Sequence, residues 1–366
     1  MKESFKGIIG HEMPVRALSH LVDAKKLPGT LLFSGPGGVG KLATALALAK
    51  ALHCKTGSPP GCDCPECSAI RAGNHPDVVV VSRDRQVTVD EMREIVSLAQ
   101  LKTSGSGERV IIFDRAELIN TPAANAALKM LEEPGNRTRF ILITDTPAML
   151  LPTIRSRSYK LRFSLLSSDE MKEFAERCGF DVEGKETIEG IRVASGCPGL
   201  LLRWLISGDY RDITMEIRDW MRGVIRRGDE PTVGSMLDWK AEWRGREGKW
   251  KIPGYMNNLY EIETKTSIPR GGDVVEIRRW IDSSGKFAFN PINWQIEGKA
   301  QKSKKIWSDS RKSLHLAKMI TRILAVEPDG PRTRDILSVQ DFIRKINWNC
   351  SFDIALERLY FKLAGN

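Results

Sequence analysis

Short apolar runs alternate with stretches of helical periodicity through the first 163 residues of the chain. The runs that we interpret as strands are Thr30–Ser34, Asp77–Val81, Arg109–Asp114, Arg139–Thr144 and Ser158–Arg162. Helices are expected to begin near Leu42, Val89 and Thr121, the last with Thr121 as N-cap and Pro122 at the first helical position. Strands that are almost entirely apolar, with helices between them, predict an α/β fold whose parallel sheet is covered on both faces. Ligands of such folds bind at the carboxyl ends of the strands.

A second pattern covers residues 164–207, where helical periodicity predicts a small helical domain. Ser167–Glu170 has the composition of a capping box, and Ala194–Gly199 marks the boundary before the next helix. Residues 351–363 place apolar groups at helical spacing behind a Ser N-cap, which predicts a helical end to the region from 208 to 366.

The middle of that region, residues 239–312, has a different composition. It holds six of the nine tryptophans and sixteen Lys and Arg against nine Asp and Glu. The alternating pieces Asp273–Ile277 and Lys286–Asn290 predict a β-rich insertion. Basic residues interleaved with Trp could grip a nucleic acid, or the tryptophans could form the core of a packing module, and we favour packing.

A glycine-rich turn lies between the first strand and the helix that follows it. Its glycines let backbone N–H groups point at an anion, the helix N-terminus adds partial positive charge, and Lys41 can reach the outer phosphates of a nucleotide. Leu42 stands where Ser or Thr would hold magnesium. The candidate nucleotide-binding residues here are Gly35, Gly37, Gly38, Val39, Gly40, Lys41 and Leu42.

Asp114 ends a strand and is placed to face this turn. An acid at that position helps to hold magnesium in phosphoryl-transfer proteins, but a strand-end acid can also cap a turn, and both roles stay open. The next residue should be Glu if water is to be activated, and it is Arg115. Glu117 is expected to point elsewhere. The pattern predicts binding of ATP or ADP and leaves magnesium and hydrolysis open.

Four cysteines, Cys54, Cys62, Cys64 and Cys67, lie in a loop that is rich in Gly and Pro. A loop with so few apolar side chains cannot be held in place by packing, but tetrahedral thiolate coordination of a metal ion would hold it. We therefore expect a structural zinc ion, with free thiols as the alternative. Four thiolates leave no open position for catalysis. His53 and His75 are reserve ligands. The single cysteines Cys178, Cys197 and Cys350 are interpreted as ordinary buried thiols.

Composition and charge set broad limits. The 366 residues suffice for two or three domains, and the net charge of +10 suits a polyanionic partner. No apolar stretch is long enough to span a bilayer and the first residues lack a signal-peptide pattern, so a cytoplasmic protein without a membrane partner is expected.

Several motifs together resemble the AAA+ clamp-loader family. They cover residues 5–205 well and the final 25 residues weakly, and they are Phe5–Gly10, the turn at 35–41, the strand ending in Asp114, Asn125–Pro134, Thr144 and Leu151–Ser158. The resemblance implies an AAA+ nucleotide-binding domain at 1–163 with a zinc module at 54–67, a lid at 164–207 and a mainly helical collar at 208–366 carrying the insertion. It also implies that Thr144 belongs to the nucleotide site. In the family, two residues separate each of the last three cysteines from the next, whereas only Asp63 separates Cys62 from Cys64.

Within that family, Leu42 and Arg115 are typical of the stator, a subunit with weak or absent ATPase activity. The motor subunits carry an arginine in the lid that is also missing here, because the nearest arginine to the matching position is Arg203. The resemblance makes Arg157 a finger that completes a neighbour's ATP site, with Arg155 as the weaker choice. It implies a hetero-oligomer of bacterial DNA polymerase III with gamma/tau and delta subunits, the sliding clamp and primer–template DNA as partners. The alternatives are an active AAA+ motor and a zinc-ribbon protein that binds nucleic acid.

Overall fold

The computed structural model describes residues 3–56, 61–82, 86–104, 107–135, 137–208, 210–212, 214–215 and 271–282. They fall into two compact units, the first containing the described residues of 1–187, 196–200 and 269–299 and the second containing the rest. The predicted helix at 351–363, the piece Lys286–Asn290, Cys350 and most of the expected collar and insertion lie outside the described residues. None of the helices described is long and apolar enough to cross a membrane.

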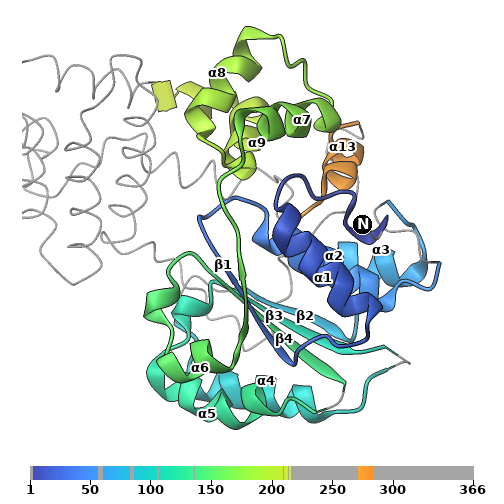
Figure 1. The fold of residues 1–366 in the computed structure, drawn as a ribbon, viewed down its shortest axis with the longest axis vertical. Helices are drawn as coiled ribbons and strands as arrows, with labels where there is room; N and C mark the ends of the chain where they lie inside the picture. Colours follow the sequence, from blue (N-terminus) through green and yellow to red (C-terminus); the bar gives the residue numbers. More distant parts are fainter. Residues whose placement is uncertain are drawn as a thin grey trace, which may run out of the picture. The chain divides into compact units, whose positions relative to one another are not determined.

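Five parallel strands form the centre of the first unit (Figure 1). Their bounds are β1 Thr30–Ser34, β2 Val78–Ser82, β3 Arg109–Asp114, β4 Thr138–Thr144 and β5 Tyr159–Arg162. The spatial order is β2-β3-β4-β1-β5, and every neighbouring pair is parallel. The predicted α/β class with a parallel sheet is confirmed, and each strand begins and ends within one residue of its expected position.

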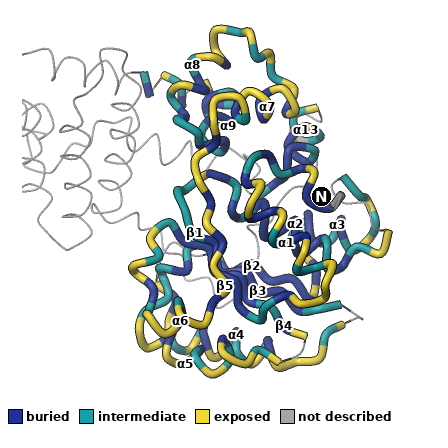
Figure 2. Tube along the Cα trace, in the orientation of Figure 1, coloured by how far each residue is buried: buried dark blue, intermediate teal, exposed yellow. Residues whose placement is uncertain are grey.

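Helices cover both faces of this sheet because successive strand residues point to opposite sides. On one side, alternate strand residues such as Leu31 and Phe33 pack with α1 and α2; on the other, Leu32 and Phe140 pack with α4 and α5. The strands β1 to β4 are accordingly almost entirely buried, whereas β5, at one edge of the sheet, is largely exposed (Figure 2). The helices and short 3-10 turns through β5 are η1 Glu3–Phe5, α1 Glu12–Asp23, α2 Lys41–His53, α3 Pro65–Ala72, α4 Val89–Gln100, η2 Ala116–Leu118, α5 Thr121–Glu132, η3 Pro147–Met149 and α6 Pro152–Arg157.

The start of α5 differs from the prediction in its cap. Thr121 is the first helical residue rather than the N-cap, and the side chain of Asn120 accepts a hydrogen bond from the Ala123 N–H at 2.9 Å. Asn is at least as good an N-cap as Thr, and Pro122 is tolerated at the second helical position because that N–H needs no intrahelical partner. The N-cap expected at Thr121 was wrong by one residue.

Three helices follow the sheet: α7 Ser168–Cys178, α8 Lys185–Ala194 and α9 Pro198–Ile206. The predicted capping box of α7 is confirmed, since Ser167 and Glu170 exchange side-chain and backbone hydrogen bonds. The boundary expected at Ala194–Gly199 is also present, because α8 ends at Ala194 and α9 begins at Pro198.

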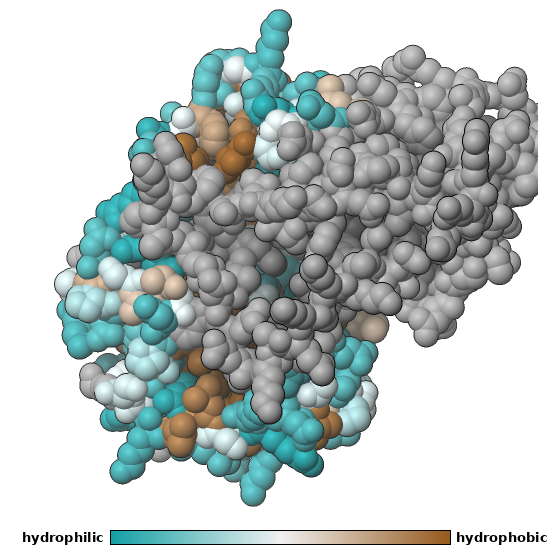
Figure 3. All heavy atoms as spheres, turned by 180° about the vertical axis from the view of Figure 1, so that it is seen from behind, coloured by the Kyte–Doolittle hydropathy of each residue, from teal (hydrophilic) through white to brown (hydrophobic). Residues whose placement is uncertain are grey.

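Seen from behind, the described surface is mostly hydrophilic, with apolar areas among the polar residues (Figure 3).

The last described helix, α13 Val274–Asp282, corrects the β interpretation of Asp273–Ile277. The Asp273 carboxylate accepts hydrogen bonds from the N–H groups of Val275 and Glu276 at 3.0 and 3.1 Å. Glu276 in turn accepts from the Asp273 N–H at 3.4 Å, which completes a capping box. Val274 and Ile277 are buried at helical spacing. The signal Asp-x-x-Glu was present in the sequence, but two adjacent valines hid it.

Buried charges hold α13 against α2, the helix that follows the glycine-rich turn (the P-loop), within the first unit. Lys50 of α2, 5% exposed, forms an ion pair with Glu276, 1% exposed, and its Nζ lies 3.9 Å from an Asp273 carboxylate oxygen. Burial raises the pKa of Glu276, and the Lys50 cation opposes that shift. Arg279 reaches the cysteine loop, where it pairs with Asp63 at 2.8 Å and donates to the Gly61 carbonyl at 2.9 Å.

Candidate functional site

The glycine-rich turn leaves the carboxyl end of β1 and enters α2, as the phosphate-binding interpretation requires. Gly35 has a φ of 146°, and a Cβ there would lie 2.1 Å from the Phe163 carbonyl oxygen. Gly40 is the N-cap of α2 with a φ of 103°. Both positions need the conformational freedom of glycine, because a side chain would be strained in that region of φ and at Gly35 would also clash with the backbone. The sequence thus builds a loop that curls over the helix N-terminus.

Lys41 lies folded into this loop. Its Nζ donates to the carbonyl oxygens of Gly35 and Pro36, both at 2.6 Å, and lies 3.4 Å from an Asp145 carboxylate oxygen. Burial lowers the pKa of Lys41, and the charge of Asp145 acts in the opposite direction. Asp145 directly follows the strand β4 and was missed by the sequence analysis, although its place at the carboxyl end of a central strand was a signal.

Two further carboxylates belong to the same site. Asp114, at the end of β3, accepts a hydrogen bond from the Ser82 hydroxyl at 3.3 Å, and both Asp114 and Glu117 favour the charged form of Lys41. Burial raises the pKa of Glu117, and a hydrogen bond with Thr144 lowers it. The expectation that Glu117 points elsewhere was therefore wrong: the 3-10 turn η2 brings it back toward β4.

Arg115 and Thr144 complete this edge of the sheet. Arg115 has a φ of 71°, which is unusual for a long side chain, and its Nε lies 3.9 Å from a Glu117 oxygen. Thr144 is fully buried, its carbonyl accepts from the Gly35 N–H at 3.2 Å, and its hydroxyl accepts from the Thr146 N–H at 3.1 Å. Thr144 thereby joins β4 to the start of the loop.

The side chain of Leu42 makes apolar packing contacts. It lies against the core cluster on the α2 side of the sheet, and a Cβ on Gly271 would be only 2.9 Å from the Leu42 Cγ. The position at which a hydroxyl would face a magnesium ion thus makes a contact with the segment that leads into α13. Whatever ligand the loop takes, Leu42 supplies no oxygen for a cation.

The remaining carbonyls of the loop are also engaged. His11 Nε2 donates to the Val39 carbonyl at 2.6 Å, and the Gly199 N–H donates to the Gly38 carbonyl at 3.0 Å. The thiol of Cys197 donates to the Gly37 carbonyl at 3.4 Å. These contacts turn the carbonyls of the loop toward the protein rather than toward a bound anion.

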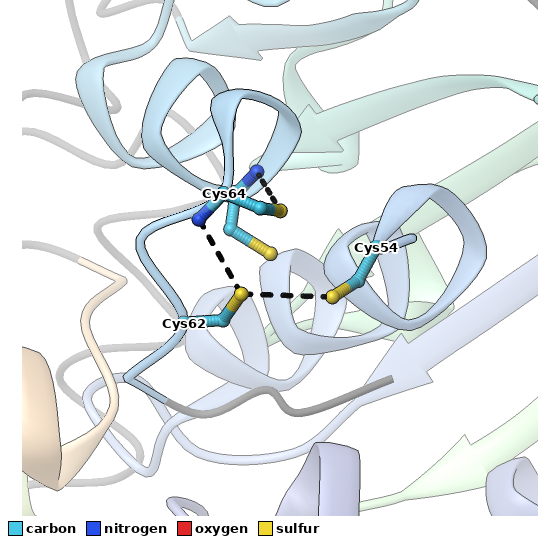
Figure 4. A group of neighbouring side chains, drawn as sticks. Cys54, Cys62 and Cys64 are labelled. Carbon is cyan, nitrogen blue, oxygen red and sulfur yellow. Dashed lines mark hydrogen bonds between the residues drawn. The ribbon is translucent and has the colours of Figure 1, made fainter. Parts of the chain in front are cut away.

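The four cysteines of the loop converge (Figure 4). All four sulfur atoms lie within 4.8 Å of one another, and those of Cys54 and Cys62 are 3.8 Å apart. Sulfur atoms in a tetrahedron with metal–sulfur bonds of about 2.3 Å are about 3.8 Å apart, so the donor set fits a tetrahedral ion. The Cys64 N–H donates to the Cys62 sulfur at 3.4 Å, which shows how the short Cys62–Cys64 spacing is accommodated.

The two reserve histidines pair with each other rather than with the sulfurs. The rings of His53 and His75 are 4.4 Å apart, and His75 Nε2 lies 3.0 Å from a Glu66 oxygen that belongs to the helix α3. Among the single cysteines, Cys178 and Cys197 are fully buried as expected. Burial raises the pKa of Cys178 to about 12.

Arg157 is the last residue of α6 and lies on the surface. Its Nε contacts a Glu132 carboxylate oxygen at 2.7 Å, and its Nη1 donates to the Thr153 carbonyl at 3.4 Å. Arg155 is less exposed, with its Nε buried. Exposed apolar residues flank α6 in the chain, Met149 on one side and Tyr159 on the other. The contact with Glu132 could not be foreseen from sequence spacing.

Comparisons with known proteins agree with this geometry. Residues 10–167 match the family model described as DNA polymerase III, delta subunit. The chain is 30% identical to DNA polymerase III subunit delta' of Pseudomonas aeruginosa over 227 residues, which cover 58% of this chain and 69% of that protein. It is 34% identical to subunit delta' of Bacillus subtilis over 164 residues, covering 43% of this chain and 49% of that one.

A relative with a different subunit name is similar over a shorter stretch. Subunit gamma/tau of Mycobacterium tuberculosis is 37% identical over 180 residues, which cover 48% of this chain and 31% of that protein. The chain thus spans less than a third of the gamma/tau length and just over two thirds of the Pseudomonas delta' length. Taken with the P-loop fold and the order of its elements, these similarities show that the chain belongs to the DNA polymerase III clamp-loader family, whose members include delta' and gamma/tau.

Proposed function

We propose that the chain is the delta' subunit, the stator of a bacterial clamp loader. In this role it joins gamma/tau and delta subunits in a hetero-oligomer that places the sliding clamp on primer–template DNA in the cytoplasm. Its P-loop takes ATP or ADP without efficient hydrolysis, and Arg157 completes the ATP site of a neighbouring subunit. Each of these statements goes beyond family membership.

The packing of Leu42 is the observation that favours a stator subunit over an active motor subunit. A motor needs an oxygen at this position to hold magnesium, and Leu42 instead contacts the core and the segment at Gly271. Arg115 replaces the carboxylate that would orient the attacking water. Glu117, two residues further along the chain, is paired with Arg115, whose Nε lies 3.9 Å from a Glu117 carboxylate oxygen.

The isolated protein should therefore hydrolyse ATP at no more than background rate. The measurement is steady-state phosphate release by the purified chain, with Lys41→Ala as the matched variant that removes the phosphate-binding amine. Equal rates for both proteins are expected. Robust ATP turnover that disappears in Lys41→Ala would instead indicate an active motor. This is the alternative function that the similarity to gamma/tau subunits suggests. Co-purification with gamma/tau and delta subunits tests the assembly separately.

We also infer that the four loop cysteines hold one structural zinc ion. The sulfur spacing supports a tetrahedral site, and the loop offers few apolar side chains that could fold it otherwise. Zinc bound there would fix the loop that Arg279 and Arg71 contact through Asp63.

Protein prepared without added metal should contain about one zinc per chain. Elemental analysis of the purified protein measures this, and Cys64→Ser and Cys67→Ser should each lose most of the metal. Cys178→Ala is the matched control, since Cys178 is buried in α7 far along the chain from the loop and should leave the zinc content unchanged. A metal-free protein with four reactive thiols and undiminished stability would show that the cluster has no metal function.

A further inference from the structure

The run Leu131–Pro134, at the end of α5, has no role in the nucleotide site described above. Leu131 is buried, and its carbonyl accepts a hydrogen bond from the Thr30 hydroxyl at 2.7 Å. Pro134 lies so close to Gly29 that a Cβ on this glycine would be 2.3 Å from the proline Cγ. Contacts with the start of β1 thus hold both sides of Glu132, which makes the end of α5 a rigid support.

Glu132 uses this support to contact Arg157. Its carboxylate lies 2.7 Å from Nε, which is the side of the guanidinium nearest the arginine backbone. The Thr153 carbonyl accepts from Nη1 at 3.4 Å. An arginine offers five N–H donors, so these two contacts set the plane of the guanidinium while its outer donors remain for another ligand.

The helix α5 adds to this arrangement. Glu132 is its last residue, and the partial negative charge at a helix C-terminus also favours a cation there. Because side chains of 47% and 38% exposure are well solvated, the ion pair contributes little to stability. Its effect is on the direction of the side chain rather than on the fold.

We propose that Glu132 is a positioning residue that orients Arg157 for the ATP site of the neighbouring subunit. The inference rests on the proposed function, since it assigns a role to Glu132 only if Arg157 acts on a neighbour. A guanidinium that is already oriented loses less conformational freedom when it meets the phosphate, and this lowers the barrier for the chemical step.

The test compares reconstituted complexes of the full chain with its clamp-loader partners, by DNA-stimulated ATP hydrolysis. Glu132→Ala should lower kcat about twofold to fivefold with little change in the KM for ATP, the range that one exposed ion pair supports. Glu132→Gln keeps an acceptor for the Arg157 Nε, so its kcat should lie between those of Glu132→Ala and wild type. Glu133→Ala is the matched control, one residue further along, and should behave as wild type. Raising the ionic strength should reduce the difference between Glu132→Ala and wild type.

Non-additivity separates positioning from a structural effect. In an Arg157→Ala background, loss of Glu132 should cause no further decrease. A Glu132→Ala complex that matches Glu133→Ala, or exceeds wild type, would overturn the inference while leaving the stator role intact if Arg157→Ala alone is slow. Full activity of Arg157→Ala would overturn both the inference about Glu132 and the proposed role of Arg157 at a neighbour's ATP site.

Discussion

Replacement of Arg157 with alanine is expected to slow ATP hydrolysis about a thousandfold at each site that this arginine completes. An arginine supplied by a neighbouring subunit stabilises the charge that develops on the transferred phosphoryl group. Arg157 is exposed and its described contacts are an ion pair and a hydrogen bond at the surface, so the variant should remain folded and should still join the complex. The measurement is DNA-stimulated ATP turnover and clamp loading by the reconstituted assembly, where the total decrease depends on how many sites lose their finger.

Two variants make this result specific. Arg157→Lys should not restore activity, because lysine lacks the planar fork that contacts several phosphate oxygens at once. Arg155→Ala, two residues earlier in α6, should be milder. Normal ATP hydrolysis and clamp loading by the Arg157→Ala assembly would leave the chain with a scaffold role at most.

Replacement of Lys50 with methionine is expected to lower the free energy of unfolding by about 3–5 kcal/mol. The substitution keeps the approximate length of the side chain but removes the cation that pairs directly with the buried Glu276 and Asp273. Equilibrium denaturant unfolding measures the change. Arg93→Ala removes an ion pair with Asp90 that is largely exposed on both sides, and it should cost less than about 1 kcal/mol.

A double variant distinguishes the loss of the ion pair between Lys50 and Glu276 from the loss of side-chain packing. Lys50→Met combined with Glu276→Met replaces both charges with apolar groups and should recover much of the lost stability, since a buried ion pair often stabilises little more than well-packed apolar residues. If the double variant is as unstable as the sum of the two single ones, Lys50 and Glu276 act independently and the pair is not what holds α13.

The parts of the fold that follow from local pattern were predictable from the sequence. Short runs of apolar residues, rich in Val and Ile in β2, β3 and β4, predicted the strands, and Ser167 with Glu170 predicted the start of α7, because such signals need only a few adjacent residues. The interpretation of Asp273–Ile277 failed for an instructive reason. Two neighbouring valines favour a strand, but the carboxylates of Asp273 and Glu276 satisfy N–H groups at the start of a helix, and burial of Val274 and Ile277 within the first unit decides the outcome.

The site was predictable as a motif but not as a set of contacts. The loop at 35–41 and the four cysteines stand out by composition and spacing. Asp145 reaches Lys41, and the charge of Glu117 acts on it, only because the strands β3 and β4 end side by side, and the pairing of Glu132 with Arg157 depends on how α5 and α6 meet. Long-range contacts of this kind leave no periodic signal in one sequence.

The attachment of α13 to α2 also has a consequence for synthesis. Lys50 and Glu276 are 226 residues apart, so at about 5–20 residues per second roughly 10–45 s pass on the ribosome between their appearance. Throughout that interval the nascent P-loop helix carries a lysine whose native counter-ion does not yet exist. The first unit can therefore reach its final packing only late in translation, and a chain released before residue 276 would present the uncovered face of α2 to chaperones and proteases.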